Sequence, residues 1–246
     1  MRKFIVLLLS IIPAPASAEW ELNMPVGVTT ISEAAYDLHM LILWITVIIG
    51  IFVFGVMIYS IIYHRKSRGF KPANFYESTK VEIIWTVIPF LILVGMAVPA
   101  TKTLILMEDT TESEITLKIT GYQWMWGYEY LDNDISFLSK IDAESNKARQ
   151  LNSKVDATSV KYYLRNVDNP VILPINTKIR LLFTASDVIH AWWVPELGGK
   201  KDAIPGYINE IWIDIKKPGV YRGQCAELCG KDHAFMPIVV KAVAKE

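Results

Sequence analysis

The stretch Gln224-Cys225-Ala226-Glu227-Leu228-Cys229-Gly230-Lys231-Asp232-His233-Ala234-Phe235-Met236 holds both cysteines of the chain. A histidine follows Cys229 by four positions, and a methionine follows that histidine by three. Thiolate, imidazole and thioether form a soft ligand set, which favours copper, zinc or iron–sulfur over calcium or magnesium. Two thiolates this close would bridge a pair of copper ions if one more imidazole came from elsewhere. His190, in Asp187-Val188-Ile189-His190, is the candidate for that imidazole.

Other interpretations of these residues stay open on spacing alone. Paired cysteines in an exported protein usually form a disulfide, although a bond across four positions closes a very small loop and gains little stability. Zinc accepts two cysteines and two histidines, but its sites rarely recruit methionine. Taken singly, His190 and Met236 are more typical of a structural histidine and of a core side chain.

The composition is that of a membrane protein with a water-exposed part. The 246 residues are 52% hydrophobic, and the mean hydropathy of +0.29 is high for a soluble protein. The formal net charge is zero, so no overall field would attract nucleic acid.

Residues 1–18 have the anatomy of a secretory signal peptide. Arg2 and Lys3 precede an apolar run, Phe4–Ile12, that is too short to span a bilayer. Ala16-Ser17-Ala18 then provides a cleavage site of small residues. We expect cleavage after Ala18, so that the mature chain begins at Glu19; an uncleaved anchor is the alternative.

Two long apolar segments predict membrane-spanning helices at about 38–63 and 83–107. Leu38–Tyr63 contains no formally charged residue, and the second segment carries Pro89 and Pro99, which membrane helices tolerate. Basic residues dominate the connection between the two spans, whereas the segment before the first span has only acidic ones. The positive-inside rule therefore places the connection in the cytoplasm and everything after Met107 outside.

Short alternating runs after residue 107 predict an all-β outer domain. Ile115, Leu117 and Ile119 alternate with polar residues, as in a half-buried strand, and proline- or glycine-containing turns separate the later runs. Many short strands with turn signals predict a sandwich or barrel. We expect strands at 115–119, through the aromatic run 122–130, and at 160–164, 171–173, 178–185, 208–215, 219–224 and 238–243. We expect an excursion over 132–159, with a short helix near 144–151, and a turn at 196–199.

These motifs together resemble subunit II of the haem–copper cytochrome c oxidases, over nearly the whole chain from about Val26. The segments that carry the resemblance are Gly223–Gly230 with His233–Pro237, Asp187–His190, Asp202–Gly206 and Gly121–Trp126. The resemblance implies an α+β membrane protein of the bacterial inner membrane. In it, residues 19–107 form an N-terminal segment and a two-helix transmembrane hairpin. Residues 108–246 form a periplasmic, all-β, cupredoxin-like Greek-key domain.

The resemblance also implies a dinuclear copper centre of the kind called CuA. Cys225 and Cys229 would bridge the two copper ions, and His190 and His233 would each bind one. Met236 and the backbone carbonyl of Glu227 would be weak ligands. The Glu227 carboxylate would serve a magnesium ion shared with subunit I.

The implied function is electron transfer within cytochrome c oxidase. Trp126, expected to be exposed above the copper site, would receive electrons from cytochrome c, and CuA would pass them to the haem of subunit I. Oxygen reduction to water and proton pumping would follow in that partner; subunit III is a further expected partner. Glu82 would lie at the mouth of a proton pathway of subunit I. Glu129, Asp168 and Asp187 would help to dock the basic face of cytochrome c.

Three rivals remain. A membrane-tethered blue-copper carrier acting alone would need one thiolate, so Cys225 argues against it. Subunit II of a quinol oxidase would look alike but lack the copper ligands, and a nitric-oxide-reducing relative would use the same copper module with another partner. The sequence has no Cys-x-x-Cys-His, so no c-type haem is attached to this chain.

Overall fold

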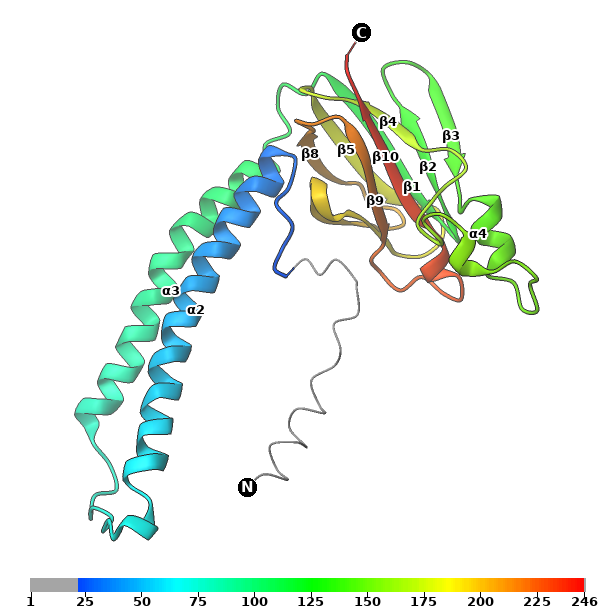
Figure 1. Cartoon of the computed structure of the whole chain (residues 1–246). Coiled ribbons are helices and arrows are strands. Elements are labelled where there is room, and N and C mark those ends of the chain that lie inside the picture. Colours follow the sequence, from blue (N-terminus) through cyan, green and yellow to red (C-terminus); the bar gives the residue numbers. More distant parts are fainter. Residues whose placement is uncertain (1–21, 246) are drawn as a thin grey trace.

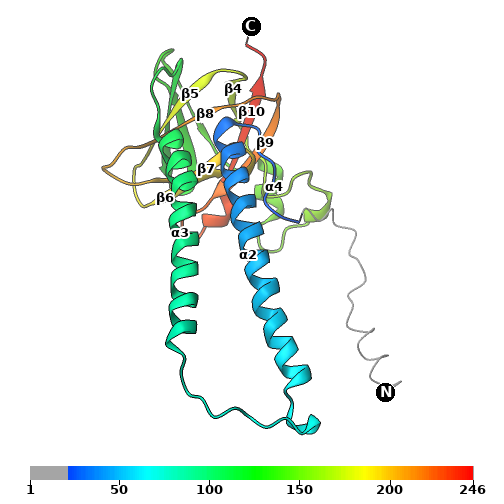
Figure 2. The same ribbon diagram turned by 90° about the vertical axis from the view of Figure 1, so that its left-hand side faces the viewer.

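A long helical hairpin is joined to one end of a β-sandwich (Figure 1). The computed structural model describes residues 22–245, so the expected signal peptide, 1–18, lies outside the described residues. Helices α2 (Thr30–Tyr63) and α3 (Thr79–Glu108) run side by side, and a connection with one 3-10 turn, η1 (Lys66–Arg68), joins them at the end far from the sandwich (Figure 2).

Both helices are long and apolar enough to cross a membrane, as predicted. Helix α2 begins at Thr30, earlier than the expected span, because Thr29 caps it. The Thr29 hydroxyl accepts from the Ser32 amide, and the Ser32 hydroxyl accepts from the Thr29 amide. A helix of 34 residues is about 50 Å long, whereas a bilayer core is about 30 Å thick. Helix α2 is therefore longer than one span requires, and its first turn packs against the sandwich, where Ile31 and Ser32 are buried.

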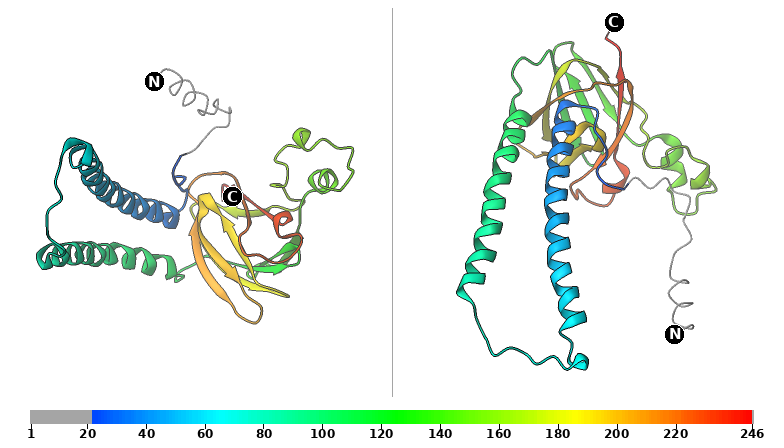
Figure 3. Two further views of the ribbon diagram at one scale, coloured as in Figure 1. Left: turned by 90° about the horizontal axis from the view of Figure 1, so that it is seen from below. Right: turned by 60° about the vertical axis from the view of Figure 1, so that its left-hand side comes forward.

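The sandwich consists of two five-stranded sheets (Figure 3). The first has the order β3-β2-β1-β5-β8, and the second has the order β4-β10-β9-β6-β7. Alternate residues of the strands fill the space between the sheets, so the core is apolar and continuous. The strands are β1 (Ile115–Tyr122), β2 (Met125–Tyr130), β3 (Ile135–Ser139), β4 (Val171–Pro174), β5 (Lys178–Ala185), β6 (His190–Val194), β7 (Gly198–Ala203), β8 (Asn209–Asp214), β9 (Gly219–Cys225) and β10 (Pro237–Val243).

Several strand predictions are confirmed, and others are wrong for identifiable reasons. The expected strand at 160–164 is a series of turns, because Tyr162 and Leu164 have left-handed backbones with φ of 57° and 60°. The aromatic run 122–130 is a hairpin that turns at Gln123 and Trp124. The expected turn at 196–199 is the 3-10 turn η3 (Pro195–Leu197) followed by β7.

Strands β3 and β6 were not predicted, and the predicted short helix has different bounds. Strand β3 lies inside the expected excursion, 132–159, because it is an edge strand with little burial and so carries little alternation. Strand β6 was not predicted, since its buried run His190–Val194 lacks a polar alternate. The short helix expected near 144–151 is α4 (Ala143–Ala148). The 3-10 turn η2 (Ala157–Ser159) follows it.

Strand β8 ties both helices to the sandwich. The Asp214 carboxylate accepts from the backbone N–H of Thr30 at 2.7 Å and from the Thr30 hydroxyl at 2.6 Å. A carboxylate at a helix N-terminus also interacts favourably with the helix dipole. Near the other helix end, the Trp212 indole donates to the Leu106 carbonyl of α3 at 2.8 Å. Ile31 and Ser32 are buried, so the joint is packed as well as hydrogen-bonded.

Replacing Asp214 should loosen this joint. We expect Asp214→Ala to destabilise the chain by about 2 kcal/mol, because it removes the charged acceptor of the Thr30 backbone N–H at the start of α2. The measurement is the unfolding free energy of the full chain in detergent. Glu210→Ala is the matched control on the same strand: its ion pair with Arg180 is half-exposed, and its loss should cost less than about 1 kcal/mol. Equal effects of the two changes would contradict this view of the joint.

Candidate metal centre

The expected donors come together at one end of the second sheet. His190 is the first residue of β6, and Cys225 is the last residue of β9. These strands are antiparallel neighbours, with Trp192 paired to Cys225, so the start of β6 and the end of β9 lie close together. Cys229 lies in the loop that follows. His233 opens the 3-10 turn η4 (His233–Phe235), and Met236 directly precedes β10.

The two sulfurs lie close together but are not bonded. Cys225 Sγ is 3.9 Å from Cys229 Sγ, and both cysteines are free, whereas a disulfide requires about 2.05 Å. Each thiol also has its own imidazole nearby. His190 Nδ1 lies 4.0 Å from Cys225 Sγ, and His233 Nδ1 lies 3.5 Å from Cys229 Sγ. The arrangement therefore contains two thiol–imidazole pairs side by side.

Weaker donors complete each pair. Met236 Sδ is 3.5 Å from Cys229 Sγ, and the Glu227 carbonyl oxygen is 3.4 Å from Cys225 Sγ. Three of these residues, His190, Cys225 and Cys229, offer ligand atoms that all lie within 4.8 Å of one another. Two thiolates, two imidazoles and a thioether suit a soft metal such as copper. The residues present therefore fit copper binding, and the side chains of Cys225, Cys229 and Met236 are no more than 4% exposed.

Aromatic side chains and an amide fix the backbone of the ligand loop. The Cys229 carbonyl accepts from Gln123 Nε2 at 2.9 Å and from Trp124 Nε1 at 3.2 Å. The Met236 carbonyl accepts from Trp126 Nε1 at 3.3 Å. These three donors come from the β1–β2 hairpin of the opposite sheet, so the ligand loop is held from across the sandwich. Sequence reasoning missed the positioning roles of Gln123 and Trp124.

Glycine allows the closest approach in the site. A Cβ on Gly121 would lie 2.7 Å from Cδ2 of His190, so any other residue would displace the imidazole. The His190 ring is also packed edge-on against Trp126, with 5.9 Å between ring centroids. The histidine is fully buried. Its position is therefore set before a metal arrives.

Asp187 orients His190. Its Oδ1 is 2.9 Å from His190 Nε2, and an Nε2–H that donates to the carboxylate leaves Nδ1 free to face Cys225. The Asp187 carboxylate also accepts from the backbone amides of Gln123 and Val188. Burial raises the pKa of Asp187, but these hydrogen bonds outweigh it and hold the pKa below its usual value. Burial lowers the pKa of His190, and its contacts with Cys225 and Asp187 raise that pKa by more.

The two thiols have different acidities. Burial raises the pKa of Cys225, but hydrogen bonds from His190 and from backbone amides outweigh it and lower the pKa to about 7. Burial and the neighbouring charge of Cys225 raise the pKa of Cys229 to about 12. The metal-free site therefore carries one thiolate near neutral pH.

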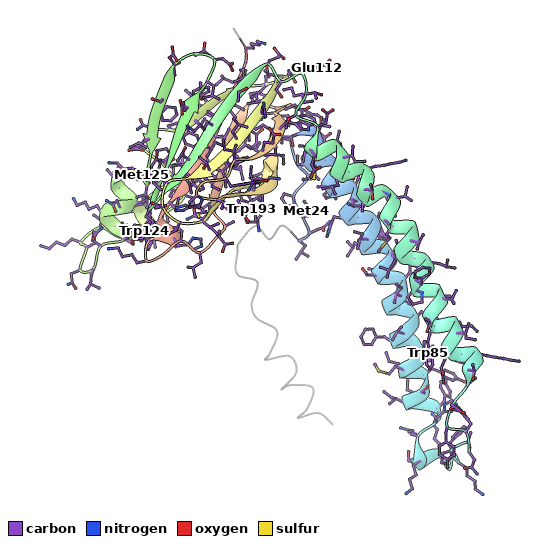
Figure 4. The ribbon with its side chains drawn as sticks, turned by 180° about the vertical axis from the view of Figure 1, so that it is seen from behind. Met24, Trp85, Glu112, Trp124, Met125 and Trp193 are labelled. Carbon is purple, nitrogen blue, oxygen red and sulfur yellow. The ribbon has the colours of Figure 1, made fainter. Side chains whose placement is uncertain are left out.

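Trp126 is not exposed, so that expectation is wrong. Its indole is fully buried between the sheets, because residues at alternate positions of β2 face the core. Trp124, in the turn just before β2, is half-buried and lies at the end of the sandwich near α4 (Figure 4). The ε-ammonium of Lys231 lies 5.5 Å from its ring centroid. Trp124 is thus the tryptophan of this pair that reaches solvent next to the ligand loop.

The other predicted site residues occupy varied positions. The Glu129 carboxylate pairs with Lys118 at 3.0 Å. The Asp168 carboxylate accepts from the backbone amides of Lys140 and Asn169. The Glu227 side chain is exposed. Glu82 is exposed in the first turn of α3, close in sequence to Trp85, which lies toward the hairpin end far from the sandwich (Figure 4).

The acidities make the titration of the metal-free chain testable. We expect Cys225 to ionise near pH 7 and Cys229 near pH 12, so the ultraviolet absorbance of thiolate should rise in two separate steps. In Cys225→Ser the remaining step should move to lower pH, because the neighbouring charge is lost. A single step that accounts for both thiols would contradict the arrangement.

Comparisons with known proteins agree over nearly the whole chain. The family described as cytochrome C oxidase subunit II, periplasmic domain, matches residues 115–243. The family described as cytochrome C oxidase subunit II, transmembrane domain, matches residues 17–103. Cytochrome c oxidase subunit 2 of Arabidopsis thaliana is 36% identical over 98% of this chain and 91% of that protein.

Two further proteins are similar to this chain. A Rickettsia bellii protein, described as a probable cytochrome c oxidase subunit 2, is 40% identical over 98% of this chain and 87% of its own length. The crystal structure of the periplasmic domain of subunit II of cytochrome oxidase from Bradyrhizobium japonicum is 42% identical. It covers 55% of this chain and 88% of that one, with a TM-score of 0.46.

The match of both families and the identity over nearly the full length confirm the resemblance and the fold class, a two-helix hairpin followed by a cupredoxin-like domain. The chain belongs to the family of cytochrome c oxidase subunit II, and thus to a haem–copper oxidase complex.

Proposed function

We propose that this chain holds a dinuclear copper centre, CuA, and receives electrons from cytochrome c for the haem of subunit I. The observation that carries the proposal is the pair of unbonded thiols 3.9 Å apart, each with its own imidazole. A bound copper pair would take up and release one electron at a time. The chain's own contribution is to hold the ligands still, since most of them are buried and their backbone is fixed from the opposite sheet.

The donor set favours two copper ions over the rival centres. A mononuclear blue-copper site uses one thiolate with two histidines and a weak axial ligand. Here a second thiol, Cys225, has its own imidazole and the Glu227 carbonyl beside it. A zinc site would not use Met236 as a ligand, because structural zinc sites use cysteine and histidine. The buried methionine 3.5 Å from Cys229 Sγ therefore supports copper.

We place the contact with cytochrome c at Trp124 instead of Trp126. The Trp124 indole reaches solvent and donates to the carbonyl of a proposed copper ligand, Cys229. Trp126, buried against His190 and bonded to the Met236 carbonyl, would act from the inside by fixing those two ligands. Glu129, Asp168 and Asp187 remain proposed docking residues, and Asp187 has the added task of orienting His190.

The placement of the copper loop fits transfer into a membrane partner. The end of the sandwich that carries η4 lies on the side toward which the hairpin extends (Figure 1). We further propose that the chain lies in a bacterial inner membrane after removal of residues 1–18, beside subunits I and III. Glu227 would then serve a magnesium ion shared with subunit I, and Glu82 would lie at the cytoplasmic mouth of a proton pathway. In that complex, oxygen reduction would be coupled to proton translocation.

Copper content tests the dinuclear centre. The full chain in detergent should retain two copper ions per chain after loading and desalting. Cys225→Ser should lose the dinuclear centre, because one bridging thiolate is gone, while insertion into membranes stays unchanged. Ser153→Ala is a control on the exposed segment around α4. Retention of one copper by the wild-type chain would favour a mononuclear carrier instead.

Electron transfer from cytochrome c tests the role of Trp124. Trp124→Ala should slow reduction of the copper site in the assembled oxidase, because a central tryptophan of a docking surface contributes on the order of 2 kcal/mol. Trp126→Phe, which keeps an aromatic ring in the core, should alter the copper spectrum more than the binding of cytochrome c. If Trp126→Phe weakened cytochrome c binding and Trp124→Ala did not, the assignment would be reversed.

A further inference from the structure

The segment between β3 and β4 folds back onto the ligand loop. Its two ends are pinned together by a β-bridge between Ile141 and Val167 and by the amide of Asp142 bonded to the carbonyl of Asn166. Between these ends the chain forms α4 and η2 and stands outside the sandwich (Figure 3). We call residues 141–167 the side lobe.

Arg149, at the end of α4, joins the side lobe to the ligand loop. Its Nη1 and Nη2 lie 3.3 and 3.4 Å from Oδ1 and Oδ2 of Asp232, a two-pronged contact. Its Nε donates to the Asn146 side chain at 2.9 Å, which fixes the plane of the guanidinium. The same group lies 4.3 Å from the centroid of the Phe235 ring. The Arg149 and Asp232 side chains are only 19% and 26% exposed.

Asp232 and Phe235 bracket the turn that carries a proposed copper ligand. Asp232 occupies the N-cap position of η4, yet its side chain makes no cap hydrogen bond there. That carboxylate is directed to Arg149 instead. His233 follows Asp232 directly, and Met236 follows Phe235 directly. One guanidinium thus contacts the residues next to two of the proposed ligands.

Apart from these contacts, short-range backbone bonds and one side chain hold this turn: Gln224 Nε2 donates to the Ala234 carbonyl at 2.7 Å. The His233 amide donates to the Gly230 carbonyl at 3.2 Å, and the Phe235 amide donates to the Asp232 carbonyl at 2.9 Å. Gly230, three residues before η4, has φ of 119°, a conformation that only glycine adopts readily. A single 3-10 turn of three residues has little stability of its own. The Arg149 contacts supply an anchor from a separate part of the fold.

We propose that Arg149 is a positioning residue that holds His233 and Met236 in their metal-binding arrangement before copper binds. The role in copper binding rests on the proposed function, whereas the anchoring of the loop by Arg149 does not require copper. Arginine suits the task because its planar guanidinium binds a carboxylate at two points and stacks on an aromatic ring at once. Lysine provides the charge without that geometry. Partners that orient metal ligands typically change metal affinity about 10- to 100-fold when lost.

Hydrogen exchange in the full chain in detergent tests the anchor without any metal. In Arg149→Lys and in Asp232→Asn, the amides of His233 and Phe235 should exchange about tenfold faster than in the wild type, because a lost hydrogen bond to a charged group favours local opening. The factor should be similar in the two variants. Amides of β1 and β5 should be unchanged. The double variant should match the single ones, because the two residues act as one unit. Arg165→Lys, an exposed arginine of the same side lobe, is the matched control.

Copper retention is the second measurement. After loading, Arg149→Lys should release copper to a chelator about tenfold faster than the wild type and Arg165→Lys. Unchanged exchange at His233 and Phe235 in a normally folded Arg149→Lys chain would overturn the proposal, and so would additive effects in the double variant. If the wild-type chain held no copper pair, the proposed function would fail while the exchange result still decided the anchoring role of Arg149.

Discussion

The separation of 3.9 Å between two unbonded sulfurs is the constraint on which the site depends. In an oxidising compartment, free thiols this close would form a disulfide if their backbone could shift enough to bring the sulfurs to about 2.05 Å. The backbone is held from several directions. Strand pairing fixes Cys225 beside β6, whereas Gln123 and Trp124 hold the Cys229 carbonyl. The fold thus keeps the sulfurs near each other and apart, which is the arrangement that bridging ligands require.

The same logic extends from the ligands to the membrane. The first sheet supplies the hairpin that holds the ligand loop, and its edge strand β8 binds α2 through Asp214 and α3 through Trp212. One sheet therefore connects the helices to the metal-binding end. A donor set on such a scaffold keeps a defined distance from anything bound to the hairpin. This is the geometry that electron transfer into a membrane partner needs.

Much of this arrangement could be predicted from the sequence because the signals were local or chemically unusual. Two uninterrupted apolar runs indicated the hairpin, and the spacing of Cys225, Cys229, His233 and Met236 indicated a soft-metal loop. Burial could not be predicted so well. The tryptophans at 124 and 126 look alike in the sequence, yet the hairpin turn leaves one at the surface and places the other in the core.

The remaining errors share a cause in long-range contacts. Strand β3 is an edge strand with little alternation, and β6 exists because β9 and β7 pair with it. Arg149 carried no signal as a partner of the ligand loop, since 83 positions separate it from Asp232. The contact of Asp187 with His190 likewise gave no signal in the sequence. Contacts of this kind arise from the tertiary fold and leave no periodic pattern.

The electron paramagnetic resonance spectrum of the copper-loaded, full-length chain in detergent tests most directly whether Cys225 and Cys229 bridge two copper ions. In the oxidised centre, two copper ions bridged by the two thiolates would share one unpaired electron. We expect hyperfine splitting from two equivalent copper nuclei. Splitting from a single copper nucleus, or a copper-free protein with Cys225 and Cys229 joined in a disulfide, would contradict this expectation.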